Sequence, residues 1–257
     1  MIELKHITKT YGDRKAVDDV TLSIPKGQIC GYLGPNGAGK TTTVKMIIGM
    51  IRPTTGDLVV AGFSVLEQGL EVKRRIGCVP ESGALYQSLT PWEYLEFIGR
   101  MYRIPEDDIG PRIREFGDFF DFKDVLHTRM IECSKGMRQK VVITSALIHN
   151  PDVIVFDEPL SGLDANSALR FKEVIRNLAN QGKTIFYCSH ILDVVENLCD
   201  RVVILDQGRI VADGSVAELK GMTRRSSLEG VFSRLTHAED VEDLAKAFSK
   251  RITRKPS

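Results

Sequence analysis

The run from Gly34 to Thr41 constrains this chain more than any other feature. It matches the pattern G-x-x-x-x-G-K-[ST], which is typical of phosphate-binding loops. The apolar run 29–33 precedes it and predicts a buried strand, and residues 42–48 after it predict a helix. A strand, a glycine-rich loop and a helix in this order predict an α/β nucleotide-binding core.

The residues of this loop supply the chemistry that a bound nucleotide needs. Glycines let the backbone turn tightly, so that successive N–H groups face one anion, and the helix N-terminus adds partial positive charge. We expect Lys40 to reach the β- and γ-phosphates and the Thr41 hydroxyl to ligate Mg²⁺. The nucleotide contacts predicted from this segment are Gly34, Asn36, Gly37, Ala38, Gly39, Lys40, Thr41 and Thr42.

Composition narrows the class of protein. With 257 residues the chain can bury a sizeable core, and its net charge of +1 gives no support for nucleic acid as the main partner. Its five scattered cysteines, without a C-x-x-C pair, predict reduced thiols in the cytoplasm. No apolar stretch reaches the length of a membrane span, and residues 1–5 do not have the form of a signal peptide.

Hydrophobic periodicity predicts an α/β fold with three parts. Strands at 2–7, 17–24 and 57–61 predict an N-terminal antiparallel β subdomain. Helical patterns over about 88–150, with Thr90 as N-cap and Pro91 at the first helical position, predict an inserted helical subdomain. Strands at 153–156, 184–188, 201–205 and 209–212, alternating with helices, predict the parallel sheet of a phosphate-loop NTPase core.

The C-terminal part of the chain is expected to be a separate extension. We predict an ATPase domain at 1–220 and a helical extension or tail at 221–257. A capping box at 215–218 begins a helix just before this boundary. Leu228, Val231, Phe232 and Leu235 stand at helical spacing, and the chain ends in a basic run that predicts a solvated tail.

Polar residues that follow two of the predicted parallel strands complete the candidate site. Asp157 and Glu158 end the apolar strand at 153–156, at the carboxyl edge where open α/β sheets bind ligands. Asp157 is expected to hold Mg²⁺, and Glu158 to orient the attacking water. His190 lies two residues beyond strand 184–188, so it is predicted at the same edge, beside the γ-phosphate or Glu158.

A second candidate anion site lies between these motifs. In the segment 133–139, the Ser134 hydroxyl and the small Gly136 precede a predicted helix. One phosphate loop already surrounds most of an ATP molecule. The second site is therefore predicted to close over the ATP of another copy of the chain.

The arrangement of these motifs resembles the ATPase subunit of ABC transporters. The family's signature is Leu-Ser-Gly-Gly-Gln, and this chain has Cys-Ser-Lys-Gly-Met at 133–137. The resemblance covers about residues 1–219. It implies adenine stacking on Tyr11, a Walker A loop at 34–42, a Walker B strand at 153–158, a D-loop at 161–164 that contains Asp164, and a switch histidine at His190.

Three positions depart from the family pattern. Glu81 stands where the Q-loop usually has Gln, and its carboxylate is still expected to ligate Mg²⁺ or a bridging water. Lys135 replaces a signature Gly and is predicted to face the γ-phosphate, whereas Met137 replaces Gln and removes a polar contact. This combination resembles the exporter branch called ABC-2 type.

The resemblance implies a mechanism and partners. Two ATP are held between two head-to-tail subunits, and hydrolysis reopens the dimer. The ATPase is expected in the cytoplasm, bound to the cytoplasmic face of the membrane through an integral membrane permease. That permease receives the motion through a surface near Tyr86, Trp92, Tyr94 and Phe97. Other hypotheses are a soluble ATPase of this family that acts on ribosomes or DNA, and a regulatory module that binds ATP without turnover. The transported molecule is not encoded in these motifs.

Overall fold

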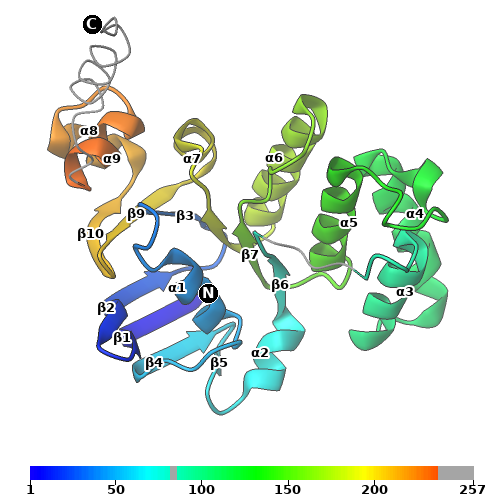
Figure 1. Ribbon diagram of the computed structural model, residues 1–257, viewed down its shortest axis with the longest axis horizontal. Helices are drawn as coiled ribbons and strands as arrows, with labels where there is room; N and C mark the ends of the chain where they lie inside the picture. The colour runs from blue at the N-terminus through cyan, green and yellow to red at the C-terminus, as the bar shows by residue number, and fades with distance from the viewer. Residues whose placement is uncertain (82–85, 237–257) are drawn as a thin grey trace, which may run out of the picture.

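The computed structural model describes residues 1–81 and 86–236, and its elements form two sheets with helices around them (Figure 1). The larger sheet has six strands in the order β10-β9-β3-β8-β7-β6. Neighbouring strands are parallel from β9 to β6, and β10 pairs antiparallel with β9. The strands are β3 (Ile29–Leu33), β6 (Ile76–Val79), β7 (Val153–Asp157), β8 (Thr184–Cys188), β9 (Arg201–Asp206) and β10 (Arg209–Gly214). The expected parallel core sheet is confirmed.

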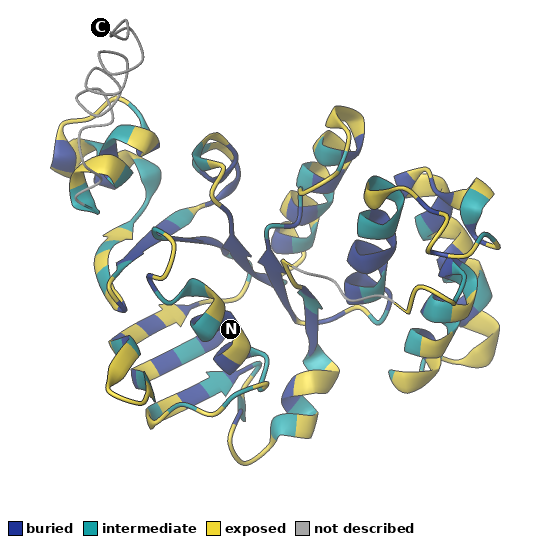
Figure 2. Ribbon diagram, in the orientation of Figure 1, coloured by how far each residue is buried: buried dark blue, intermediate teal, exposed yellow. Residues whose placement is uncertain are grey.

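Both faces of this sheet are buried, and Figure 2 shows its central strands as continuously buried. In β3, Ile29 and Leu33 belong to one hydrophobic cluster, whereas Cys30 and Tyr32 belong to the other. A strand buried on both faces needs apolar residues at every position, which explains the unbroken apolar runs in the sequence. Polar side chains at the strand ends are therefore the ones that reach solvent.

The second sheet forms the predicted N-terminal antiparallel subdomain. Its order is β2-β1-β4-β5, and its strands are β1 (Ile2–Tyr11), β2 (Arg14–Ile24), β4 (Thr55–Val60) and β5 (Phe63–Ser64). Helix α1 (Lys40–Ile47) buries Val44, Met46 and Ile47 in the hydrophobic cluster that also contains residues of both sheets. The phosphate loop before α1 is thereby anchored in the core.

The predicted helical insert is also present. It consists of α3 (Pro91–Met101), α4 (Glu106–Phe120), a short 3-10 helix η1 (Lys123–Val125) and α5 (Lys135–Leu147). Thr90 caps α3 as expected: its hydroxyl accepts the Glu93 N–H at 3.2 Å, and the Glu93 carboxylate accepts the Thr90 N–H at 2.9 Å. The boundaries of the insert as a domain remain a prediction.

Helix α5 packs closely against strand β6 and joins the helical insert to the core sheet. A Cβ added at Gly77 would lie 1.9 Å from the Ala146 carbonyl oxygen. Beyond α5, the His149 ring stacks on Tyr102 with centroids 3.6 Å apart, and its Nε2 donates to the Ile76 carbonyl at 3.1 Å. Burial lowers the pKa of His149 to about 4, so the ring is neutral at physiological pH.

Two further helices follow the core strands, and two end the described chain. Helix α6 (Ala165–Asn180) follows β7, and α7 (Leu192–Leu198) follows β8. Helix α8 (Val216–Thr223) begins at the predicted capping box of Ser215 and Glu218, and α9 (Leu228–Leu235) buries Leu228 and Val231 in the main core. The basic end predicted as a solvated tail lies outside the described residues.

Some local predictions differ from the structure. Helix α1 begins at Lys40 rather than at residue 42, because Gly39, with φ +111°, turns the loop directly into the helix. Neither α2 (Gly69–Arg75) nor the four-residue strand β6 was predicted from the sequence, and β6 is a strand because it pairs with β7. In the part of the chain that the structure describes, no helix combines the length and hydropathy of a membrane span.

We expect Gly77→Ala to destabilise the protein. The new methyl group would overlap the Ala146 carbonyl and push α5 away from β6, at a cost of about 1–3 kcal/mol in the free energy of unfolding. Urea denaturation, monitored by circular dichroism, measures this change in the free energy of unfolding. Gly221→Ala is the matched control, because no described atom lies within 4 Å of its Cβ and alanine favours the α8 helix. Equal stability of the two variants would contradict the packing argument.

Candidate nucleotide-binding site

The phosphate loop needs glycine at particular positions. Gly37 and Gly39 have φ values of +81° and +111°, in the region that disfavours side chains. A Cβ at Gly34 would lie 2.4 Å from the Leu205 carbonyl, and one at Gly39 would lie 2.3 Å from the Ala16 carbonyl. The loop therefore packs directly on backbone, which only glycine allows.

Lys40 lies across this loop. Its ammonium group donates to the carbonyl oxygens of Gly34 at 2.6 Å and Pro35 at 3.1 Å. Arg14, at the start of β2, also donates to the loop, to the Gly37 carbonyl at 3.2 Å. Two cations thus contact the backbone that is expected to hold phosphate. Arg14 was not singled out from the sequence, where it is one basic residue after a turn.

The parallel pairing of β7 with β8 brings the predicted catalytic residues together. Glu158 adopts a left-handed backbone with φ +52°, and its N–H donates to the Cys188 carbonyl at 3.0 Å. Its carboxylate accepts the His190 backbone N–H at 2.7 Å and lies 2.8 Å from His190 Nδ1. The Ser189 hydroxyl donates to the other carboxylate oxygen at 3.2 Å. Both oxygens of the Glu158 carboxylate are therefore bound by Ser189 and His190, which follow β8.

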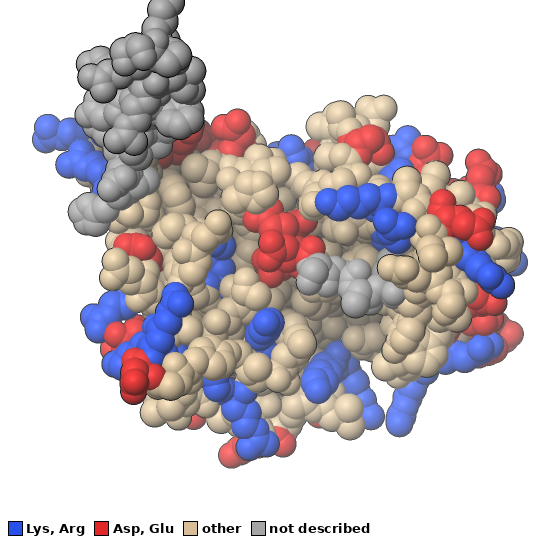
Figure 3. All heavy atoms as spheres, in the orientation of Figure 1, with Lys and Arg blue, Asp and Glu red and all other residues tan. Residues whose placement is uncertain are grey.

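Asp157 lies at the end of β7 with only 6% of its surface exposed. Burial and the nearby carboxylates of Glu81 and Glu158 raise its pKa to about 6, against the opposing effect of Lys40. The three carboxylates line one cavity, and closely spaced carboxylates favour a cation between them. Figure 3 shows where acidic and basic atoms gather on one face of the molecule, with a group of acidic atoms near its middle.

These groups line one cavity of about 840 Å³. Its size suits a ligand as large as a nucleotide. Tyr11, which is 51% exposed, lies in its wall together with Arg14. The predicted site residues that the cavity brings together are Tyr11, Gly34, Asn36, Gly37, Gly39, Lys40, Thr41, Thr42, Glu81, Asp157, Glu158 and His190. Ala38, also predicted to contact the nucleotide, is buried and does not line this cavity.

The cavity offers the ligands of a magnesium ion. The Thr41 hydroxyl and the carboxylates of Asp157 and Glu81 are hard oxygen donors, which Mg²⁺ prefers. Within residues 1–81 and 86–236, no three acidic, cysteine or histidine side chains form a metal cluster by themselves. Mg²⁺ usually takes one or two protein carboxylates and completes its shell with phosphate oxygens and water, so these residues fit it.

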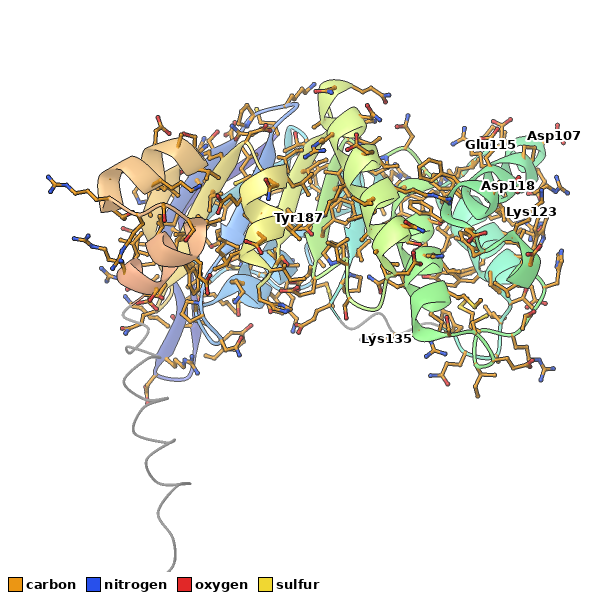
Figure 4. All side chains as sticks on the ribbon, turned by 90° about the horizontal axis from the view of Figure 1, so that it is seen from above. Asp107, Glu115, Asp118, Lys123, Lys135 and Tyr187 are labelled. Atoms are coloured by element: carbon orange, nitrogen blue, oxygen red, sulfur yellow. The ribbon has the colours of Figure 1, made fainter. Side chains whose placement is uncertain are left out.

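The second predicted anion site lies elsewhere on the surface. Ser134, Lys135, Gly136 and Asp164 do not line the cavity of the phosphate loop in the described structure. Figure 4 labels Lys135 at the beginning of α5, well apart from Tyr187 on the central strand β8. The Ser134 hydroxyl accepts the Met137 N–H at 3.1 Å and caps α5.

The segment 161–164 packs against this helix start. Lys135 donates to the Ser161 hydroxyl at 3.1 Å, and a Cβ at Gly136 would lie 2.6 Å from the Gly162 carbonyl. Asp164 caps α6 by accepting the Ser167 N–H at 2.8 Å, and hydrogen bonds from Ser167 hold its pKa well below the usual range. The two segments form one surface, which we call the signature surface (residues 134–137 and 161–164).

A further cavity, of about 590 Å³, lies between α2, α3, α5 and β6. Leu70 and Met101, which are 65% and 62% exposed, contribute to its apolar wall, and Lys73, Arg74 and Arg103 line it with basic charge. Of the four aromatic residues predicted for a partner surface, Tyr94 lines this groove. The centroid of the Tyr86 ring lies 6.5 Å from that of the Tyr94 ring. Trp92 instead packs against His127, and Phe97 is exposed but not part of the groove wall.

Besides Arg14, three residues of this site were not singled out from the sequence: Ser189, Leu192 and Phe232. Ser189 contacts Glu158 directly, and its signal was a hydroxyl residue next to the histidine at the sheet edge. Leu192 and Phe232 also line the main cavity. Phe232 comes from α9, about forty residues beyond β8, and no local pattern indicated that it would reach this site.

Known proteins resemble this chain in sequence. A family model described as "ABC transporter" matches residues 17–161. The ABC transporter ATP-binding protein NatA of Bacillus subtilis is 41% identical over 90% of this chain and 96% of its own length. A Nod factor export ATP-binding protein of Cupriavidus metallidurans is 32% identical over 85% of this chain and 72% of its own length.

Solved structures show the same fold. An ATP-binding subunit of an ABC transporter superposes with a TM-score of 0.87 at 31% identity, covering 92% of this chain and 99% of that one. A dimeric ATP-binding cassette in a post-hydrolysis state bound to ADP and Pi superposes with a TM-score of 0.77 at 26% identity, covering 84% and 98%.

Proposed function

This chain belongs to the ABC transporter family and is an ATPase of that family, and from this premise we propose that it hydrolyses ATP between two copies of itself and drives export through a separate membrane permease. The observation that carries the proposal is the separation of two half-sites. The cavity holds the phosphate loop and Glu158, whereas the signature surface lies outside it. Two copies placed head to tail supply one another's missing half.

Each residue of the cavity has a proposed part in the reaction. Tyr11 stacks on adenine, and the backbone of residues 34–41 with Lys40 binds the phosphates. Thr41, Asp157 and Glu81 hold Mg²⁺, which neutralises negative charge that develops on the phosphate oxygens. Glu158 orients and deprotonates the attacking water, while His190 and Ser189 keep its carboxylate in position.

The signature surface completes the site of the second copy. Ser134 and the N–H groups at the start of α5 provide hydrogen-bond donors for a γ-phosphate presented by the partner. Lys135, held near Ser161, adds a positive charge beside them, and Asp164 fixes the turn that supports it. ATP that contacts both copies binds the closed dimer better than the open one, so its hydrolysis shifts the dimer toward opening.

Export is the direction that the relatives support. The Nod factor export protein is named for this direction, and the match covers 85% of this chain and 72% of that protein. The apolar groove between α2, α3 and α5, lined by basic residues, is proposed to take an amphipathic segment of the permease that carries acidic residues. The protein would then work on the cytoplasmic face of the membrane.

Glu158→Gln is expected to abolish hydrolysis and preserve ATP binding. The amide cannot take a proton from water, so the hydrolysis rate should fall by about 10²–10⁴-fold. ATP then accumulates in a closed dimer, which size-exclusion chromatography with ATP and Mg²⁺ detects. Hydrolysis at the wild-type rate would contradict the role of Glu158.

Mixing two inactive variants tests whether the site is composite. Lys40→Ala damages the phosphate loop, and Ser134→Arg damages the signature surface, so each homodimer should be inactive. In an equimolar mixture, half of the dimers contain one copy of each variant. Such a dimer has one intact composite site out of two, so activity should return to about a quarter of wild type.

The matched control mixes Lys40→Ala with Glu158→Gln. Both lesions lie in the same half-site, so every composite site in that mixture is damaged and no activity should return. The head-to-tail arrangement would be contradicted if ATP hydrolysis returned in the control mixture, or if it did not return when Lys40→Ala is mixed with Ser134→Arg.

Leu70→Asp tests the groove. An added carboxylate in the apolar wall removes apolar contact and repels an acidic segment, so co-purification with a multi-span membrane permease should fall by about tenfold, while ATP hydrolysis by the isolated chain stays unchanged. Met222→Asp, at a 78% exposed position of α8, is the control and should leave capture intact. Equal capture of both variants would place the docking surface elsewhere.

A further inference from the structure

The C-terminal helix α9 contributes to the wall of the ATP cavity. Phe232, on α9, lines this cavity together with His190 and Leu192. The ring is half-buried and packs against the main hydrophobic cluster. The residues that bind phosphate and metal come from the core domain, so α9 is an addition to the site rather than part of its phosphate-binding machinery.

Glu196 of α7 ties α9 to the segment that carries His190. Its carboxylate forms an ion pair with Lys220 of α8 and accepts the Leu228 backbone N–H, at the start of α9, at 2.9 Å. Leu228 and Val231 are fully buried beside it. Arg234 also donates to the Thr223 carbonyl at 2.8 Å, which holds α9 against α8.

The spacing along the two helices explains why Phe232 reaches the cavity. One helical turn before Glu196 on α7 stands Leu192, and one turn after Leu228 on α9 stands Phe232. Because Glu196 contacts Leu228 and both Leu192 and Phe232 line the cavity, α7 and α9 run side by side in opposite directions. Leu192 is two residues after His190, so Phe232 borders the start of the helix that follows the histidine.

We propose that Phe232 is a positioning residue for hydrolysis: held by the Glu196 contacts, it packs beside Leu192 and keeps the His190 segment paired with Glu158. His190 itself is 79% exposed at its side chain and depends on this pairing for its position. An apolar ring beside Leu192 restricts the motion of the segment that carries His190, and so keeps the contact with Glu158 formed. The inference rests on the proposed role of Glu158 and His190 in hydrolysis.

Phe232→Ala in the purified full-length chain tests this role. We expect kcat for ATP to fall about tenfold, a fraction of the full general-base contribution, with KM and the Kd of a fluorescent ADP analogue within about twofold of wild type. Phe232→Leu should restore most of kcat, because it restores apolar bulk beside Leu192. Leu235→Ala is the matched control, since it removes a half-buried apolar side chain from the same helix outside the cavity wall.

Glu196→Ala provides a second test that alters no residue of the cavity wall and applies if Phe232→Ala does not fold. It removes both ties to α8 and α9, so kcat should fall with an unchanged Kd. The proposal is overturned if either folded variant keeps the wild-type kcat, if Phe232→Ala raises Kd alone, or if Leu235→Ala loses kcat equally. Glu158→Gln, measured in parallel, distinguishes failure of this inference from failure of the proposed function. If Glu158→Gln hydrolyses ATP at the wild-type rate, the proposed function of the site is contradicted, whatever Phe232 does.

Discussion

The parallel pairing of β7 with β8 is the constraint on which the candidate site depends. It aligns Asp157 with Cys188, so that the residues after both strands emerge at one edge of the sheet. Glu158 then turns through a left-handed backbone to donate its N–H to Cys188 and accept hydrogen bonds from Ser189 and His190. Such backbone strain costs on the order of 1–3 kcal/mol and persists only where surrounding contacts fix it.

The buried sheet confines polar chemistry to this edge. Its two faces contact different hydrophobic clusters, one continuous with the antiparallel sheet and α1, the other with the helical insert and α6. The phosphate loop reaches the same edge from β3, packed on the carbonyls of Ala16 and Leu205. The groups proposed to bind phosphate and to catalyse hydrolysis follow three strands of one rigid layer, which would pre-organise them for reaction.

The starts of two helices and the positions of three strands could be predicted from the sequence. Capping boxes at Thr90 and Ser215 begin helices where expected, because side-chain and backbone groups three residues apart decide them. Strands β3, β7 and β8 were predicted because both of their faces are apolar. Strand β6 was missed because Gly77 and Cys78 carry little strand signal, and it exists through pairing with β7 and close packing under α5.

The sequence by itself determined the phosphate loop, most of the core strands, and the acidic residues and histidine after two strands, since each depends on neighbours within a few positions. Only the tertiary structure decided that His190, expected beside the γ-phosphate or Glu158, holds Glu158 together with Ser189. It also decided that Lys135 lies against Ser161 and that Phe232 reaches the main cavity. These contacts join residues that are 26 to 32 positions apart, and in the case of Phe232 farther still. Strand register and helix packing create such contacts, and local periodicity predicts neither of them.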